Sequence, residues 1–196
     1  MIRNALLILL TLAVAICGGA ASVAFVLEHD IKVGSLRVGP WTAYPSSGSP
    51  DADPYSLAEA AADGALSLGR SEGIIFSTGE DSAGNDLRSE CTYELTGETP
   101  FARFWTLRTE PYDYADAVRV KNPPSHGALH SRSLIRGADN SLAVTIGPSA
   151  APGNWMRTTG TGRIRLVLTT YDAPIRGGPM AETVVMPSIK RISCDG

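Results

Sequence analysis

A single uncharged stretch, Ala5–Leu27, limits what this chain can fold into more than any other feature. At a rise of about 1.5 Å per residue, a helix over this stretch is about 34 Å long, which is enough to cross the roughly 30 Å hydrocarbon core of a bilayer. A helix also satisfies all of its own backbone hydrogen bonds in lipid. The sequence therefore predicts a membrane-spanning anchor over residues 1–30 and one folded domain over residues 31–196.

The charges that flank this stretch predict its orientation. Arg3 precedes it, and Glu28 and Asp30 follow it. Because basic residues are retained on the cytoplasmic side, the folded domain is expected on the exported side. A cleaved signal peptide is the alternative, since the small residues Gly18–Ser22 suit a signal peptidase. The apolar run continues past them to Leu27 and is longer than the roughly 7–15 apolar residues of a cleavable signal, which favours the anchor.

Charge and cysteine content narrow the class of partner and the compartment. The chain has 17 Lys and Arg against 20 Asp and Glu, a net charge of −3, which indicates no basic surface for nucleic acid or anionic lipid.

Of its 3 cysteines, Cys17 lies in the apolar stretch, which leaves Cys91 and Cys194 in the domain. A pair of cysteines on the exported side predicts a disulfide. Two buried or metal-binding thiols are the alternative, although no Cys-x-x-Cys spacing supports a metal.

Hydrophobic periodicity predicts a mainly β domain with one helix. Ile31–Gly39 has the pattern of a short strand, and Asp53 is a good N-cap for a helix that begins at Pro54 and continues to Leu68. After this helix the apolar period becomes two, which predicts strands with one face on a core and one in water. These strands are Ile74–Thr78, Glu90–Thr96, Arg103–Thr109, Ser141–Gly147 and Arg163–Tyr171. Their regular spacing favours an antiparallel sandwich or barrel.

The carboxy-terminal half resembles a known family. The motifs are Ser133–Pro148, Gly153–Met156, Leu166–Asp172 and Met186–Ile189. Across roughly Leu129–Arg191 they resemble the bacterial domains of unknown function numbered 1214 (DUF1214), and the whole chain looks like the short, membrane-anchored, single-domain forms of proteobacteria. The resemblance implies a jelly-roll-like β-sandwich and no catalytic mechanism. A bacterial origin makes the exported side of the anchor the periplasm.

Few side chains are spaced for catalysis or metal binding. His126 and His130 are four residues apart, but Gly127 lies between them and no third ligand is evident, so neither a metal nor a cofactor is expected. A sugar hydrolase would need a pair of carboxylates, yet strand periodicity puts Glu90 and Glu94 on the outward face, where they are expected to be solvated. The other acidic candidates are Asp81 and Asp86.

Asn154 and Trp155 form the most informative pair for a binding site. In the favoured interpretation, Trp155 fills the core and the Asn154 amide bonds to the backbone of the preceding Pro152-Gly153 turn. In the alternative, Trp155 and Asn154 belong to a shallow aromatic platform for a sugar or a protein partner. The other members of that platform are Trp105, Arg157 and Tyr171.

The sequence favours a binding or scaffolding module over an enzyme, because no acid, base and nucleophile converge in the pattern. We expect an inner-membrane-anchored periplasmic domain that docks on an envelope protein or a membrane complex. The hypotheses left open are a hydrolase of envelope glycan or ester, and a carbohydrate-binding module.

Overall fold

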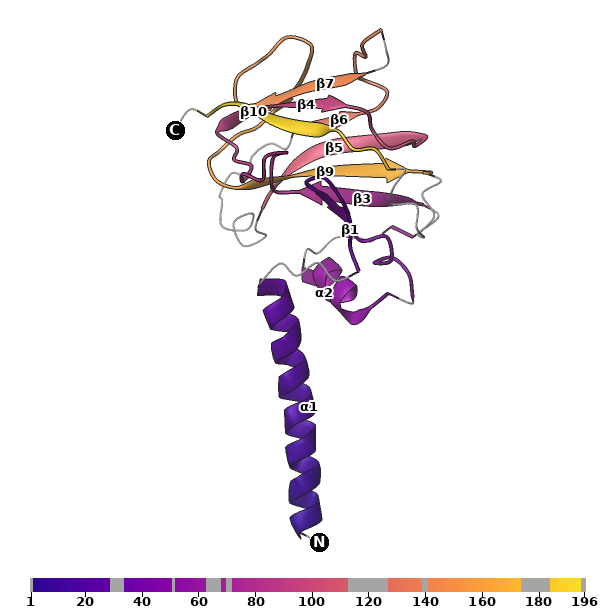
Figure 1. The fold of residues 1–196 in the computed structure, drawn as a ribbon, viewed down its shortest axis with the longest axis vertical. Coiled ribbons are helices and arrows are strands. Elements are labelled where there is room, and N and C mark those ends of the chain that lie inside the picture. The colour runs from indigo at the N-terminus through magenta and orange to yellow at the C-terminus, as the bar shows by residue number, and fades with distance from the viewer. Residues whose placement is uncertain are drawn as a thin grey trace.

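The computed structural model describes residues 2–28, 34–50, 52–62, 68–69, 72–112, 127–138, 141–173 and 184–194 of the chain. Helix α1 (Ile2–Glu28) is a straight rod that projects from the rest of the molecule, and α2 (Pro54–Ala62) lies between its end and the β-strands (Figure 1). The membrane-crossing window within Ile2–Phe25 has none of its residues buried inside the structure. Its length and composition suit a membrane span, and the side of the membrane on which the β domain lies stays a prediction.

The strands form two sheets, so the predicted mainly β fold is confirmed. The larger sheet contains, in spatial order, β1 (Leu36–Val38), β2 (Trp41–Ala43), β3 (Gly73–Thr78), β9 (Ile164–Tyr171), β5 (Phe104–Pro111) and β6 (Ala128–His130). The smaller sheet contains β10 (Ser188–Cys194), β4 (Cys91–Gly97), β7 (Leu142–Gly147) and β8 (Asn154–Arg157). In Figure 1, β7, β4 and β10 of the smaller sheet lie above β5, β9 and β3 of the larger sheet. The jelly-roll arrangement of their connections stays an expectation.

One pair of strands departs from the predicted antiparallel pattern. β7 and β8 run parallel, with Val144 opposite Asn154 and Gly147 opposite Arg157. Side chains of β8 reinforce this pairing, because the Asn154 amide donates to the Ala143 carbonyl (2.9 Å) and the Trp155 indole N–H donates to the Gly147 carbonyl (3.1 Å). Periodicity predicts which face of a strand is buried but carries no information about strand direction, so this pair was not foreseen.

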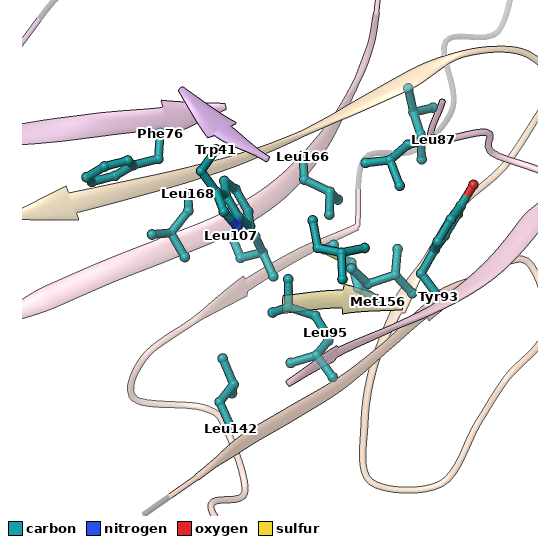
Figure 2. Close-up of a cluster of buried hydrophobic side chains, with 14 of the residues drawn as sticks. Trp41, Phe76, Leu87, Tyr93, Leu95, Leu107, Leu142, Met156, Leu166 and Leu168 are labelled. Carbon is teal, nitrogen blue, oxygen red and sulfur yellow. The ribbon is translucent and has the colours of Figure 1, made fainter. Parts of the chain in front are cut away.

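A hydrophobic core fills the space between the sheets. Alternate residues of β4, β5 and β7 point into it, which confirms the period-two prediction of the inward faces of these strands. Figure 2 shows these side chains meeting from the two sheets. The fully buried members include Trp41, Phe76, Leu87, Tyr93, Leu95, Leu107, Leu142, Met156, Leu166 and Leu168. The Trp41 indole N–H donates to the Pro187 carbonyl at 2.8 Å, which ties β2 of the larger sheet to the residue before β10.

The predicted start of the soluble helix is confirmed. Asp53 accepts a hydrogen bond from the Ser56 backbone N–H at 3.0 Å and from the Ser56 hydroxyl, as an N-cap residue does. The helix ends at Ala62 in the described part of the chain, and residues 63–67 lie outside it.

The strand predicted over residues 31–39 is present in shortened form, since β1 covers only Leu36–Val38 and residues 31–33 lie outside the described part of the chain. The chain turns at Gly39, with a φ of 58°, and β2, which was not predicted, follows with all three of its residues buried. A three-residue strand is too short for a period to identify it.

The predicted disulfide is present. Cys91 and Cys194 are joined where the end of β10 pairs with the start of β4. The bond closes a loop with a sequence separation of 103, which spans most of the β domain.

Candidate functional site

The residues of the predicted aromatic platform lie on different parts of the sandwich. Trp105 is 2% exposed and faces the core from β5, so it belongs to no surface. Tyr171 ends β9 on the larger sheet and is exposed. Asn154, Trp155 and Arg157 are on β8, at the edge of the smaller sheet. The structure therefore does not assemble the platform as one surface, and a binding role for any single member stays a prediction.

Asn154 fastens a neighbouring segment of backbone. Its side-chain oxygen accepts from the Ile135 N–H (2.8 Å), and its amide donates to the Ile135 carbonyl (2.7 Å) and to the Ala143 carbonyl (2.9 Å). The expected bond to the Pro152-Gly153 turn is thus replaced by bonds to residues distant in sequence. Trp155 is half-buried rather than enclosed in the core. The structural role of Asn154 is confirmed, but its partner was predicted wrongly.

The outer face of the larger sheet carries an exposed row of aromatic rings. The ring of Phe104 lies 5.7 Å from that of His130 and 5.8 Å from that of Tyr171, measured between centroids. We call His130, Phe104 and Tyr171 the aromatic strip. His130 and Tyr171 are exposed and Phe104 is half-buried.

Sheet register explains how the aromatic strip forms. Phe104 lies directly opposite Tyr171 across β5 and β9, and His130 on β6 lies opposite Thr106, the next residue on that face of β5. Trp105 and Leu107 point into the core, so Phe104 and Thr106 point outward. Opposite and diagonal cross-strand neighbours on one face are within reach of aromatic side chains.

Charged groups lie at both ends of the aromatic strip. At the His130 end, the Arg132 guanidinium lies 5.9 Å from the centre of the Phe104 ring. At the Tyr171 end, Arg103 pairs with Asp172 at 3.5 Å, and both side chains are exposed. Asp172 has a φ of 51°, a left-handed conformation that aspartate tolerates better than most residues. Exposed aromatic rings with an arginine beside them are suited to contact with another molecule.

Farther along β5 from Phe104, an ionic network covers the outer face of the larger sheet. Glu110 accepts from Arg108 (2.8 Å) and from Arg165 (3.1 Å), and Arg108 also donates to the Thr169 hydroxyl (3.3 Å). Thr169 is 3% exposed, so β9 is buried on both faces and the prediction of one solvated face is wrong for this strand. The reason is its central place between β3 and β5, where the long side chains of neighbouring strands cover it.

The acidic candidates serve the fold instead of forming a pair. Asp81 is 2% exposed and accepts from the backbone N–H groups of Ala83 and Asn85, both at 2.9 Å. Burial alone would raise the pKa of Asp81, but these bonds, the Asn85 side chain and the nearby Arg191 charge together lower it. Asp86 pairs with Arg163 at 2.7 Å.

Glu90 does not lie on a solvated face, contrary to prediction. Its side chain is 19% exposed and accepts from the Gly162 N–H (3.0 Å) and from Arg88. Burial would raise the pKa of Glu90, but the backbone N–H groups of Gly162 and of Glu90 itself, with the hydrogen bond and charge of Arg88, lower it to about 2. Glu94 is exposed on β4 as predicted. Glu90 thus holds the turn before β9 against the turn before β4.

The histidine pair considered for a metal cannot be tested as a pair, because His126 lies outside the described residues. Among the residues that the structure does describe, no group of three or more His, Cys, Asp or Glu side chains could hold a metal ion.

The sequence did contain a signal for the aromatic strip. Phe104 is a large apolar residue at an outward position of the alternating run that contains Trp105 and Leu107.

Comparison with known proteins identifies relatives by sequence family and by fold. The family model described as "Protein of unknown function (DUF1214)" matches residues 72–175, which include all of β3, β4, β5 and β9. No curated protein matches the chain.

Two solved structures are similar. The VPA0106 protein from Vibrio parahaemolyticus superposes with a TM-score of 0.53 at 18% identity, over 73% of this chain and 36% of that one. An uncharacterised protein from Burkholderia cenocepacia gives 0.43 at 18% identity, over 76% of this chain and 45% of that one. This chain therefore spans less than half the length of either, and the first likeness shows the fold alone.

Proposed function

This chain belongs to the DUF1214 family, which is defined without a function, and from its own geometry we propose that it is a membrane-anchored binding module. In this proposal α1 holds the β domain at the periplasmic face of a bacterial inner membrane. The β domain docks on an envelope protein or a membrane complex and acts as a scaffold. The aromatic strip, with Arg132 beside it, is the docking surface.

The aromatic strip is the observation that carries the proposal. Tyr, Phe and Arg are enriched at the centres of protein interfaces, because each offers a large contact area, to which Tyr adds a hydroxyl group and Arg a charge. Tyr171 and Arg132 each lie beside the Phe104 ring on one exposed face, although three different stretches of the chain supply these residues. Fully folded strands fix the rings, so little side-chain entropy is lost when a partner covers them.

The anchor supports the same role. A domain tethered to a bilayer meets other membrane-bound proteins at a raised effective concentration, so a small surface is sufficient for useful binding. None of the membrane-crossing window of α1 is buried inside the structure, which leaves its whole surface free for lipid.

A photocrosslinker tests the proposal in native membranes. Phe101, which is 82% exposed and precedes the aromatic strip by three residues, accepts a photoreactive phenylalanine without altering the strip itself. We expect a reproducible crosslinked protein at position 101, and its loss when Phe104→Ala and Tyr171→Ala are combined. The matched control carries the crosslinker at Ile192, which is 55% exposed on β10 of the other sheet. Equal products at both positions, or none at position 101, would contradict a docking role for this face.

A carbohydrate-binding module is the second candidate, because the same rings favour it. The negative face of an aromatic ring attracts the C–H groups of a sugar, and exposed rings in a row suit successive sugar units. Saturable binding of a purified envelope glycan by the full chain in detergent, with no protein crosslinked at position 101, would support this candidate instead.

A further inference from the structure

The aromatic strip has a cationic end. Arg132 is exposed, its guanidinium lies 5.9 Å from the Phe104 ring centre, and it makes no ion pair with any residue that the structure describes. His130 is also exposed and lies 5.7 Å from the same ring. Both side chains flank the Phe104 ring with their donor groups open to solvent.

Three other arginines of this sheet already have a carboxylate partner. Arg103 pairs with Asp172, and Arg108 and Arg165 share Glu110. The positive charge at Arg132 is therefore available to a partner, in a chain whose net charge is −3. An exposed guanidinium supported by a ring is a good receptor for a carboxylate, because it presents a planar fork of donors.

We infer that the aromatic strip binds an acidic protein segment. A carboxylate of the partner pairs with Arg132 beside His130, and an adjacent apolar side chain covers Phe104 and Tyr171. This inference rests on the proposed docking function and adds the chemistry of the partner to it.

The two ends of the aromatic strip also fix the direction of the bound segment. Asp172 lies at the Tyr171 end, and its charge is balanced by Arg103 at 3.5 Å, so that end offers no net attraction to an anion. An acidic group is attracted to the Arg132 end only. Complementary charges at the edge of an interface set register and the rate of encounter more than they set affinity. The binding should therefore weaken as salt is added.

Charge substitutions in the crosslinking experiment test the inference. The full chain, with the photoreactive residue at position 101, is compared in native membranes with its Arg132→Glu and Arg132→Lys variants. Lys190→Glu, on the exposed side of β10, is the matched control for the loss of positive charge. Urea unfolding of each purified variant checks that the β domain is intact, which is expected because Arg132 is exposed.

The expected result is a crosslink yield at least about fivefold lower for Arg132→Glu, since reversing one exposed charge removes a pair and adds repulsion. Lys190→Glu should keep the yield within about twofold of the unmodified chain. Arg132→Lys, which keeps the charge but loses the planar fork of donors, should lower the yield by less than Arg132→Glu does. Added salt, at about 0.5 M, should also lower the yield. Mass spectrometry should place Asp or Glu next to the crosslinked residue of the partner.

Two other outcomes overturn the inference in distinguishable ways. An undiminished crosslink in Arg132→Glu would refute the acidic partner while the docking function stands. A crosslinked glycan, or no crosslink in the unmodified chain, would refute the protein partner and the docking function together.

Discussion

Replacing Glu90 with glutamine should lower the stability of the β domain in a way that depends on pH. In the folded state this carboxylate is 19% exposed, and it accepts hydrogen bonds from the Gly162 N–H at 3.0 Å and from Arg88. Burial opposes its ionisation, but these donors and the Arg88 charge outweigh burial and lower its pKa from 4.5 to about 2. The folded state therefore binds the ionised form of Glu90 more tightly than the unfolded state does.

The size of the effect follows from the shift of the pKa. The difference between 4.5 and about 2 corresponds to about 3.5 kcal/mol of unfolding free energy at about 1.4 kcal/mol per pKa unit. Because the folded-state pKa is the lower one, this contribution is complete above pH 4.5 and is lost as the pH falls towards 2. Glu90→Gln keeps an acceptor oxygen for Gly162, so we expect a loss of about 2–3 kcal/mol at pH 7 and almost none near pH 2.

Urea titration of the full chain in detergent measures this effect. Trp41, Trp105 and Trp155 all lie in the β domain, so their fluorescence reports its unfolding. The matched control is Glu94→Gln, which changes an exposed residue of β4 and should alter stability by less than about 0.5 kcal/mol at any pH. A loss for Glu90→Gln that is constant from pH 7 to pH 3, or one no larger than the control, would refute the reasoning.

Three further predictions concern the stability and attachment of the β domain. Replacing both Cys91 and Cys194 with alanine should lower the unfolding free energy by about 4–5 kcal/mol, because the disulfide closes a loop with a separation of 103. Thiol titration of the denatured, unreduced chain should find only Cys17 reactive. Asn154→Ala should cost about 2–3 kcal/mol in urea titration, since it removes three hydrogen bonds between segments, and an unchanged midpoint would contradict the fastening role. If α1 spans the bilayer as proposed, alkaline carbonate washing of membranes should leave the chain in the pellet. Release into the supernatant would contradict the anchor.

Local sequence chemistry was sufficient for several features. An uncharged apolar run specifies a helix long enough for a bilayer, Asp53 before Pro54 specifies a helix start, and strict alternation specifies the inward faces of β4, β5 and β7. Each of these depends on residues within a few positions of each other. For the same reason, the alternation around Trp105 was sufficient to put this residue on an inward face of its strand. Its assignment to a surface platform would have needed information on contacts between distant residues, which a local pattern does not contain.

Only the tertiary structure decided which outward side chains become neighbours. Strand order places β5 between β9 and β6, and this brings Phe104 against Tyr171 and His130 from distant parts of the chain. Packing of the turns against each other also enclosed Glu90, although the periodicity of its own strand predicted exposure. A period of two in a sequence determines the side of a strand on which a residue lies. The total free energy of the folded sandwich decides which strands pair, and in which direction and register. It therefore also decides which residues meet on any one surface of the sandwich.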